Sequence, residues 1–341
     1  MPESMNDVVT RIEHGIGRIT LNRPQALHAL TTEMCVAMAQ ALTEWENDAQ
    51  VHAVLVDHAE GTRGFCAGGD IRKIAQSGRG DGVEAREFFA VEYRLNAQIK
   101  RYPKPCIAVI DGITMGGGVG ISVHGSHRIA TERTIFAMPE TGIGLFPDVG
   151  GGWFLPRLEG ELGTWLALTG AQLRGSDVVA AGIATHFVQS EQIAALKAGI
   201  LAQGVDVIDR YAQAVPTPAY AQHNETIDRC FGHGTMSEIS LALNGDGSDW
   251  ARKQAEILTK RSPQSLAVSL RQLREGRKMD SFEDVMRMEY RIASRITSTR
   301  DFSEGVRAVI EDKDNAPRWQ ADVTPEMVDS LFAPLEHELS L

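Results

Sequence analysis

The sequence has no closely spaced cysteine pair, no long apolar run and no excess of basic residues. Its four cysteines show no C-x-x-C spacing, so we expect reduced thiols in a reducing compartment rather than a disulfide framework. No apolar run approaches the length that a membrane-spanning helix needs. The net charge of −11 argues against a nucleic-acid-binding surface, because binding to phosphates requires clustered Lys and Arg.

Several catalytic sequence motifs are also missing. There is no G-x-G-x-x-G fingerprint, no Walker-type lysine and no G-x-S-x-G sequence around Ser122. These absences argue against dinucleotide binding, P-loop chemistry and an α/β-hydrolase triad. His124 and His127 have the spacing of half a metal site, but no cysteine or acidic cluster at ligand spacing completes it. We therefore predict neither a metal nor a separate cofactor.

The composition is that of an ordinary soluble protein. Of the 341 residues, 43% are hydrophobic and 23% are charged, which is enough apolar material for a sizeable core. The 33 glycines cluster at 61–82, 112–125 and 142–152, and this clustering indicates local backbone demands. The first residues are acidic and contain no apolar h-region, so we see no secretory signal and expect a cytoplasmic protein.

The first half of the sequence predicts a repeated order of strand, strand and helix. Two β-rich runs at 8–12 and 17–21 indicate a hairpin, and Thr31 or Thr32 is a candidate N-cap for a helix that ends near Glu46. Farther along we expect strands at 51–56, 106–110, 113–115, 127–131 and 135–138, a long helix within 81–102 and a short helix at 116–123. This pattern differs from the strand–helix alternation of a doubly wound sheet.

The second half is predicted to be mainly helical. We expect helices at 162–169, 177–181, 191–201, 205–214, 265–275, 282–296 and 302–311. We place the domain boundary so that residues 1–195 form the core that carries the chemistry and residues 196–341 form a mainly helical C-terminal region.

Two glycine-rich turns are candidate sources of backbone N–H donors. The sequence 66–70 (CAGGD) follows a predicted strand, and 116–118 (GGG) stands at the start of a predicted helix, where unpaired amides carry a positive partial charge. If both turns face one oxygen atom, they supply what an enolate or a tetrahedral oxyanion needs. The alternative is purely structural: a surface turn in which Asp70 caps a helix, and a tight turn that requires glycine.

Two carboxylates stand eight positions apart in a loop rich in glycine and proline. Glu140 lies among apolar neighbours, and Asp148 follows Phe146 and Pro147. Because a buried carboxylate is costly to ionise, such neighbours raise the pKa. A raised pKa suits a general base, a general acid or a nucleophile. The alternative for Glu140 is an ordinary solvated loop glutamate.

Three motifs in this order resemble the crotonase (enoyl-CoA hydratase/isomerase) superfamily. They are 65–70 (FCAGGD), 112–120 (GITMGGGVG) and 136–141 (FAMPET). The continuation 144–152 (GLFPDVGGG) and the following 155–158 (LPRL) are similar to the branch that hydrolyses 3-hydroxyisobutyryl-CoA in valine catabolism. The likeness extends through 181–186, 288–291 and 301–308, so it covers nearly the whole chain, most weakly at 192–260.

The resemblance implies an α/β fold, a crotonase-like spiral of repeated β-β-α turns with a helical C-terminal region. It also implies that the N–H groups of Ala67 and Gly117 form an oxyanion hole for the thioester carbonyl. Gly68 and Asp70 then belong to the turn that binds the substrate.

The resemblance further implies roles for three acidic residues. Glu140 matches the catalytic glutamate of the family, and Asp148 matches the second acidic residue of the hydrolase branch. Glu92 matches a glutamate that contacts the substrate in that branch. Hydratases of the superfamily have a second catalytic glutamate where this sequence has Gly120. The expected activity is therefore hydrolysis of a short-chain 3-hydroxyacyl-CoA thioester, with 3-hydroxyisobutyryl-CoA as the expected substrate.

Two other functions stay open at this point. One is an enoyl-CoA hydratase or isomerase with the same pocket, and the other is a non-catalytic paralogue that binds acyl-CoA. In each case we expect an acyl-CoA molecule as the partner, rather than nucleic acid or a membrane. Whether the protein forms a homo-oligomer stays open. Gln25 and His28 differ from the family pattern in a loop near the CoA phosphates. Candidate replacements for the missing basic residue are Arg23, Arg72, Lys73 and Lys313.

Overall fold

The computed structural model describes residues 6–341, and the chain forms two compact units. Unit 1 comprises Met1–Gly69, Arg94–Phe136 and Leu173–Ala219, and unit 2 comprises Asp70–Tyr93, Ala137–Gln172 and Tyr220–Leu341. Both units therefore contain segments that are far apart in the sequence. The predicted boundary at 195/196 follows the sequence alone and stays a prediction.

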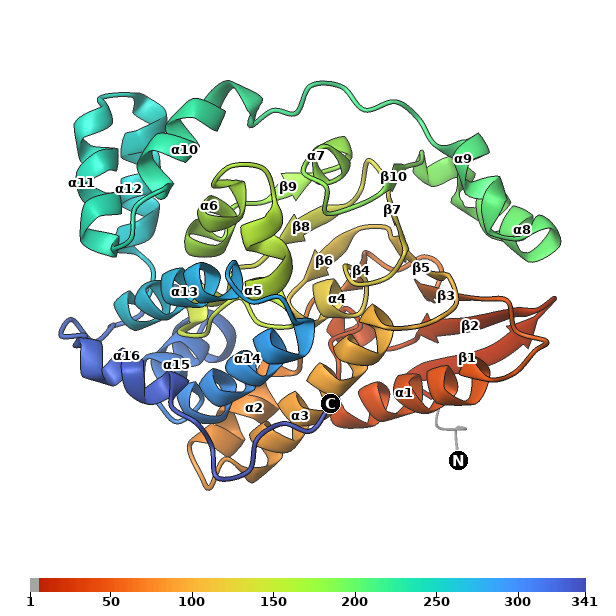
Figure 1. The fold of residues 1–341 in the computed structure, drawn as a ribbon, viewed down its shortest axis with the longest axis horizontal. Coiled ribbons are helices and arrows are strands. Elements are labelled where there is room, and N and C mark those ends of the chain that lie inside the picture. The colour runs from red at the N-terminus through yellow and green to blue at the C-terminus, as the bar shows by residue number, and fades with distance from the viewer. Residues whose placement is uncertain (1–5) are drawn as a thin grey trace. The chain divides into compact units, whose positions relative to one another are not determined.

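Unit 1 contains two β-sheets, and the chain alternates between them. The six-stranded sheet has the order β1-β2-β3-β5-β7-β10, and the four-stranded sheet has the order β4-β6-β8-β9 (Figure 1). The strands are β1 (Val8–Glu13), β2 (Ile16–Leu21), β3 (Ala53–His58), β4 (Gly64–Cys66), β5 (Cys106–Ile110), β6 (Ile113–Met115), β7 (His127–Ala130), β8 (Ile135–Ala137), β9 (Leu173–Arg174) and β10 (His186–Phe187). Each of the pairs β3–β4, β5–β6 and β7–β8 places one strand in each sheet before a helix follows. This order confirms the predicted repeated β-β-α turns.

The six-stranded sheet is parallel except for its first pair. Strands β1 and β2 form the predicted antiparallel hairpin, and β2, β3, β5, β7 and β10 pair in parallel. Strand β5 (CIAVI) and the first four residues of β3 (AVLV) are apolar and buried, as is typical of a parallel sheet that is covered. Leu55, Ile107 and Ile129 pack in one core cluster with Leu196 and Ile200 of helix α8 (Ile193–Gln203). One core cluster of unit 1 therefore lies between this sheet and α8.

A buried ion cluster fastens α8 to the sheet. The fully buried Asp57 of β3 accepts hydrogen bonds from Arg18 Nη2 and Thr20 Oγ1, each at 2.7 Å, and Lys197 Nζ of α8 lies 2.7 Å from the same carboxylate. Burial alone would raise the pKa of Asp57, but Lys197 and Arg18 together lower it. Two cations and a hydroxyl thus satisfy a carboxylate that would otherwise be costly to bury.

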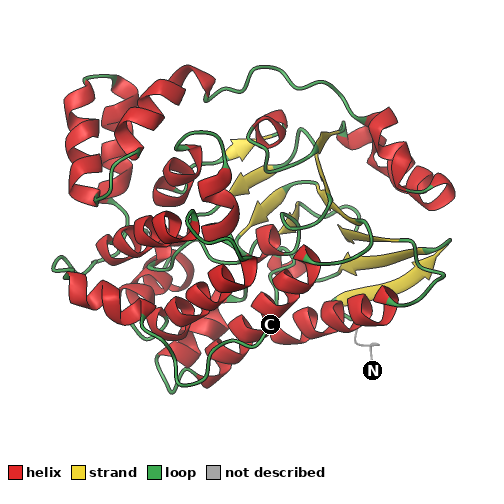
Figure 2. Cartoon of the chain, in the orientation of Figure 1, coloured by secondary structure: helices red, strands yellow, loops and turns green. Residues whose placement is uncertain are grey.

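The other helices come from both units, and Figure 2 shows that the chain beyond β10 consists of helices and loops. The α-helices other than α8 are α1 (Thr32–Glu46), α2 (Ile71–Gly78), α3 (Val83–Lys100), α4 (Gly117–Gly120), α5 (Gly151–Phe154), α6 (Leu162–Thr169), α7 (Ser176–Ala180), α9 (Ile208–Tyr211), α10 (Asn224–Phe231), α11 (Met236–Asp246), α12 (Asp249–Thr259), α13 (Pro263–Gly276), α14 (Phe282–Ile296), α15 (Arg300–Val306) and α16 (Pro325–Phe332). The helical C-terminal region predicted from the sequence is therefore confirmed.

Local signals placed some elements well and missed others. The side chain of Thr31 accepts a hydrogen bond from Met34 N and caps α1, as one of the two predicted N-caps. The short helix expected at 116–123 is shorter in the structure: it runs from Gly117 to Gly120, and residues 121–124 form turns. The helices at 71–78, 224–231, 236–246, 249–259 and 325–332 were not predicted.

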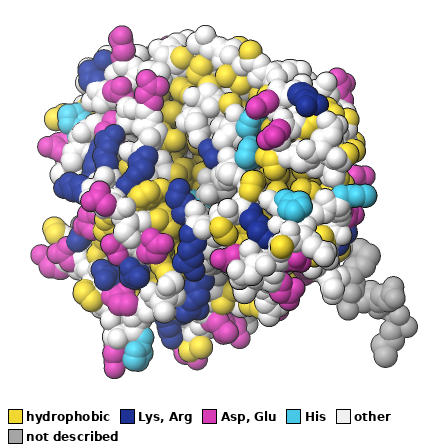
Figure 3. Space-filling view, turned by 45° about the vertical axis from the view of Figure 1, so that its right-hand side comes forward, with side chains coloured by type: hydrophobic (Ala, Val, Ile, Leu, Met, Phe, Trp, Pro, Cys, Tyr) yellow, Lys and Arg dark blue, Asp and Glu magenta, His cyan; other side chains and the backbone are white. Residues whose placement is uncertain are grey.

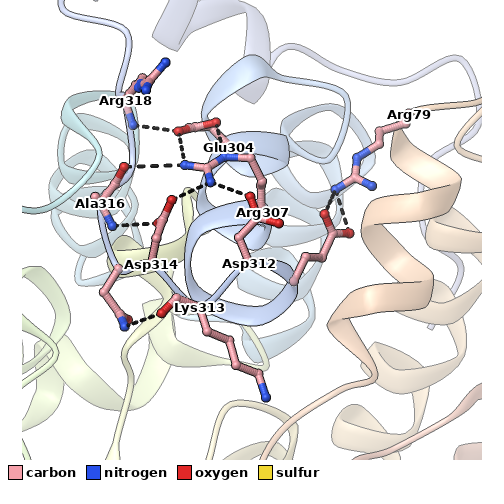
Figure 4. A network of polar contacts seen from close by, with 10 residues as sticks. Arg79, Glu304, Arg307, Asp312, Lys313, Asp314, Ala316 and Arg318 are labelled. Carbon is pink, nitrogen blue, oxygen red and sulfur yellow. Dashed lines mark hydrogen bonds and ion pairs between the residues drawn. The ribbon is translucent and has the colours of Figure 1, made fainter.

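The last predicted helix changes its winding. Helix α15 is followed by a π-helical turn, Arg307–Glu311. The Arg307 guanidinium contacts the carboxylates of Asp312 and Asp314 at 2.7 Å and that of Glu304 at 2.8 Å, and Figure 4 shows these acids gathered around it. One arginine thus fixes the chain as it leaves the helix.

Two general properties follow for the described residues. None of the helices within residues 6–341 is both long and apolar enough to cross a membrane. The cysteines Cys35, Cys66, Cys106 and Cys230 are buried, and none of them forms a disulfide within the described residues.

Figure 3 shows Lys and Arg side chains beside Asp and Glu side chains on the face in view, with hydrophobic side chains among them.

Candidate active site

Unit 2 gathers four buried carboxyl groups. Glu92 lies on α3, Glu140 and Asp148 lie in the loop between β8 and α5, and Glu289 lies on α14. None of them is more than 5% exposed. The charge of Asp148 acts on each of the other three. The structure therefore brings together Glu92, Glu140 and Asp148, which the sequence predicted, and adds Glu289, which it did not.

Glu140 is held by a short turn that the local sequence explains. It opens a 3₁₀ turn, Glu140–Ile143, which ends at Gly144 in the left-handed region (φ +77°), and the Leu145 N–H donates to the Glu140 carbonyl at 3.0 Å. A side chain at Gly144 would overlap the backbone at Asp301, so glycine is required there. Glu140 Oε2 has no hydrogen-bond partner among the described residues. A buried carboxyl oxygen without a partner is available to a reacting molecule.

Burial sets the acidity of these groups. It raises the pKa of Glu140 well above the usual range of a glutamate, and the Asp148 charge raises it further. Burial likewise raises the pKa of Glu92, with smaller contributions from Asp148 and Glu140. Burial raises the pKa of Asp148 to about 7, although the Tyr93 hydroxyl lowers it. A carboxyl with a pKa of about 7, as Asp148 has, can exchange protons near neutral pH, as general acid–base catalysis requires.

Tyr93 is a site residue that the sequence did not indicate. It is fully buried on α3, and its hydroxyl donates a hydrogen bond of 2.9 Å to Asp148 Oδ2. A hydrogen bond to the charged form of an acid favours ionisation. The sequence offers no signal for this role, because Tyr93 is one more large side chain on an amphipathic helix.

The substitution Tyr93→Phe is expected to raise the pKa of Asp148. It removes a side-chain hydrogen bond that lowers this pKa, while the ring and its packing stay. The pKa can be measured from the carboxyl carbon resonance of labelled Asp148, with Tyr102→Phe as the matched control. An unchanged or lower pKa in Tyr93→Phe would show that this hydrogen bond does not control the ionisation of Asp148.

Glu289 and Gln272 bind the backbone around Asp148. Glu289 accepts hydrogen bonds from the N–H groups of Gly150 and Gly152 at 2.7 and 2.8 Å. Gln272 Nε2, on α13, donates to the Pro147 carbonyl at 2.7 Å and to Glu289 Oε1 at 2.9 Å. Burial raises the pKa of Glu289 to about 8, although these three donors lower it. In the sequence, Glu289 was indicated only by the family likeness of segment 288–291.

Unit 1 contains the glycine-rich turns. The N–H of Gly117 lies in the first turn of α4, and a Cβ built on Gly68 would be 3.8 Å from this nitrogen. The structure therefore brings Gly68 and Gly117 together. Gly68 has φ +116°, a conformation that side chains rarely allow. No hydrogen bond among the described residues uses the N–H of Gly68, Gly69 or Gly117.

The N–H of Ala67 already has a partner. It donates to the Leu27 carbonyl at 3.0 Å, in the loop before α1. The assignment of Ala67 to an oxyanion hole stays a prediction. The N–H groups of Gly68 and Gly69, which follow in the same turn, are the donors without such a partner.

The remaining residues that the sequence singled out lie at the ends of short helices. Asp70 occupies the N-cap position of α2, but its side chain makes no capping hydrogen bond there. Gly120 closes α4, whose four residues are Gly, Gly, Val and Gly, so this helix has no carboxyl. Among residues 6–341, no three His, Cys, Asp or Glu side chains are arranged to hold a metal ion.

Comparisons with known proteins identify relatives over nearly the whole chain. A family profile described as Enoyl-CoA hydratase/isomerase matches residues 16–332. The "3-hydroxyisobutyryl-CoA hydrolase, mitochondrial" of Danio rerio is 48% identical over 95% of this chain and 89% of the relative. The protein of the same name from Homo sapiens is 45% identical over 94% of this chain and 86% of the relative.

Two solved structures share the fold in full. A carnitinyl-CoA dehydratase from Mycobacterium thermoresistibile has a TM-score of 0.94 and 43% identity, with 98% of both chains covered. An enoyl-CoA hydratase from Rhodobacter sphaeroides has a TM-score of 0.92 and 40% identity, with 98% of this chain and 100% of the other covered. The names of these proteins describe reactions other than thioester hydrolysis.

The buried carboxyl cluster, the two glycine-rich turns and the paired sheets thus occur in a chain whose relatives cover it almost completely. The profile match and the identities above leave one assignment: the chain belongs to the enoyl-CoA hydratase/isomerase (crotonase) family.

Proposed function

We propose that this protein is an acyl-CoA thioester hydrolase that acts on a short 3-hydroxyacyl-CoA, with 3-hydroxyisobutyryl-CoA as the expected substrate. The observation that carries the proposal is the buried pair Glu140 and Asp148, two carboxyls with raised pKa values on one loop. The identity of 45–48% to relatives named 3-hydroxyisobutyryl-CoA hydrolase supports it. The lack of a carboxyl on α4 argues against two-glutamate hydration chemistry.

The first requirement is stabilisation of the thioester oxygen. When the carbonyl carbon is attacked, negative charge develops on its oxygen, and preorganised N–H donors stabilise that charge. We assign this task to the N–H of Gly117 and to an N–H of the Gly68–Gly69 turn. The unpaired state of these amides supports the assignment. Ala67, the donor predicted from the sequence, has the Leu27 carbonyl as its partner.

The second requirement is a nucleophile, and Glu140 serves by one of two routes. In the first, a Glu140 oxygen bonds to the carbonyl carbon, the C–S bond breaks, and the CoA thiolate takes up a proton. Water then hydrolyses the resulting anhydride. In the second, ionised Glu140 removes a proton from water, which attacks the carbonyl directly. The partnerless Oε2 atom of Glu140 is available for either route.

The other acids orient the reactants. We assign to Asp148 the orientation of the substrate hydroxyl or of the water, because Tyr93 fixes one of its oxygens. Glu92 contacts the substrate through Oε1, which has no partner among the described residues. Gly68 and Asp70 belong to the binding turn.

A free-thiol assay over a panel of short 3-hydroxyacyl-CoA and enoyl-CoA esters tests the proposal. We expect thiol release from 3-hydroxyisobutyryl-CoA to be faster than from any enoyl-CoA. Absence of thiol release from every ester would reject the hydrolase.

The second candidate is an enoyl-CoA hydratase, which the names of the two similar solved structures favour. In the same panel, it would remove the absorbance of an enoyl-CoA without releasing thiol. It requires Glu140 to perform both proton transfers, because Gly120 offers no second acid.

Two further proposals concern location and the CoA phosphates. We keep the cytoplasmic location as a proposal, to be tested by cell fractionation, while the curated relatives carry "mitochondrial" in their names. For the phosphates we favour Lys73 and Lys313, because Arg72 already donates to the Ile310 carbonyl and Arg23 donates to the Ala29 carbonyl. Figure 4 shows the Lys313 side chain extending away from the carboxylates around Arg307.

A further inference from the structure

The backbone after Asp148 has an unfavourable conformation. Val149 has φ +52°, in the left-handed region, and its side chain is fully buried. Gly150 follows with φ +85°. A β-branched residue rarely adopts this conformation, and such outliers persist only where the surroundings hold them. Something in unit 2 must therefore hold the turn.

Glu289 and Gln272 hold it from two sides. Both Glu289 oxygens are used, one for the Gly150 N–H and the other for the Gly152 N–H, at 2.7 and 2.8 Å. Gln272 Nε2 holds the Pro147 carbonyl and Glu289 Oε1. Both side chains are fully buried. The chain is thus bound immediately before and immediately after Asp148 and Val149.

The turn packs closely against the two helices that carry these side chains. Helix α5 packs against α13 and α14, which carry Gln272 and Glu289. A Cβ built on Gly152 would lie 3.1 Å from Glu289 Oε1 and 3.2 Å from Gln272 Cγ. A larger residue at position 152 would therefore have to displace one of these side chains by a few tenths of an ångström.

Asp148 depends on this turn for its direction. Its side chain is buried and accepts the Tyr93 hydroxyl at 2.9 Å. The two oxygens of Glu289 are engaged by backbone amides and Gln272. Glu289 thus acts on Asp148 through the backbone of the turn.

We propose that Glu289 is a positioning residue of the reaction: its two carboxyl oxygens hold the strained turn at Val149, and Gln272 supports it, so that Asp148 points at the substrate. This inference rests on the proposed function, in which Asp148 orients the substrate hydroxyl or the water. Glutamine at position 289 offers one acceptor oxygen instead of two, so one loop amide then faces an NH₂ group.

A double-mutant cycle tests the proposal. We expect Glu289→Gln to lower kcat for thiol release about 10- to 100-fold, because a misplacement of the order of 1 Å has such an effect, with KM changed less than about threefold. In an Asp148→Asn background, Glu289→Gln should lower kcat by no more than about twofold, since the residue it positions is already lost. Glu283→Gln, the same change on the same helix, is the control and should retain wild-type kcat.

Two results would overturn the proposal: a wild-type kcat in Glu289→Gln, or losses that multiply in the double variant. If Glu289→Gln does not fold, Gln272→Leu takes its place in the same cycle and should show the same dependence on Asp148. If the wild-type protein releases no thiol, the proposed function fails separately. A crystal structure of Glu289→Gln then decides: Val149 at positive φ with the Tyr93–Asp148 bond intact would refute the positioning role.

Discussion

Glu140→Gln is expected to abolish thiol release from the acyl-CoA substrate, with kcat falling by roughly 10²- to 10⁴-fold, the range that a general acid–base group supplies. Glutamine keeps the size of the side chain but can neither ionise nor attack the carbonyl. Adding Gly120→Glu to this variant should not restore thiol release. The rate is measured by trapping free CoA, and Glu283→Gln, the same change at a half-buried glutamate outside the site, serves as the control. Full thioesterase activity in Glu140→Gln would remove Glu140 from the mechanism.

The same variant has an expected effect on stability that separates lost chemistry from lost folding. The pKa of Glu140 is raised in the folded protein, so between the unfolded and folded pKa values the folded state binds more protons. Stability in that range therefore falls as the pH rises. Glutamine removes this dependence, so Glu140→Gln should have a higher Tm than the wild type at pH 8. A lower Tm at pH 8 would mean that the variant loses activity through misfolding.

Gly118→Ala is expected to lower kcat/KM by roughly 10²- to 10³-fold, the loss that accompanies one missing oxyanion donor. A Cβ at this position would overlap the Cys66 carbonyl oxygen and lie 2.8 Å from Cys66 Cβ. Helix α4 must then move away from β4 and carry the Gly117 N–H with it. The overpacking should also lower stability by about 1–3 kcal/mol.

Gly245→Ala is the matched control for this substitution. Gly245 lies on α11, and a Cβ built there meets nothing within 4 Å. The change should keep kcat/KM and raise helix stability by about 1 kcal/mol or less. Kinetics and thermal unfolding of both variants check the pair of expectations. If Gly118→Ala retains kcat/KM within threefold, the position of α4 does not matter to catalysis.

Local sequence signals were sufficient for much of the fold. The hairpin β1–β2, the Thr31 cap and the apolar strands of the large sheet follow from propensity, capping and hydrophobic runs, which act over a few residues. Helices α10, α11 and α12 were missed, in the segment where the family likeness is weakest. In that segment polar residues interrupt the helical spacing of hydrophobic residues, so the helices become evident only from their packing within unit 2.

For the candidate site, the sequence by itself determined that Glu140 and Asp148 share a loop. It also determined that two turns are rich in glycine, so that no side chains obstruct their backbone N–H groups. It did not determine their partners. Tyr93 stands 55 positions from Asp148, and Glu289 stands 139 positions from Gly150, so no local pattern connects them. Only the tertiary structure placed these side chains together, turned the Ala67 amide to Leu27 and raised the carboxyl pKa values. The reason is that burial and hydrogen bonding depend on segments that meet only when the chain has folded.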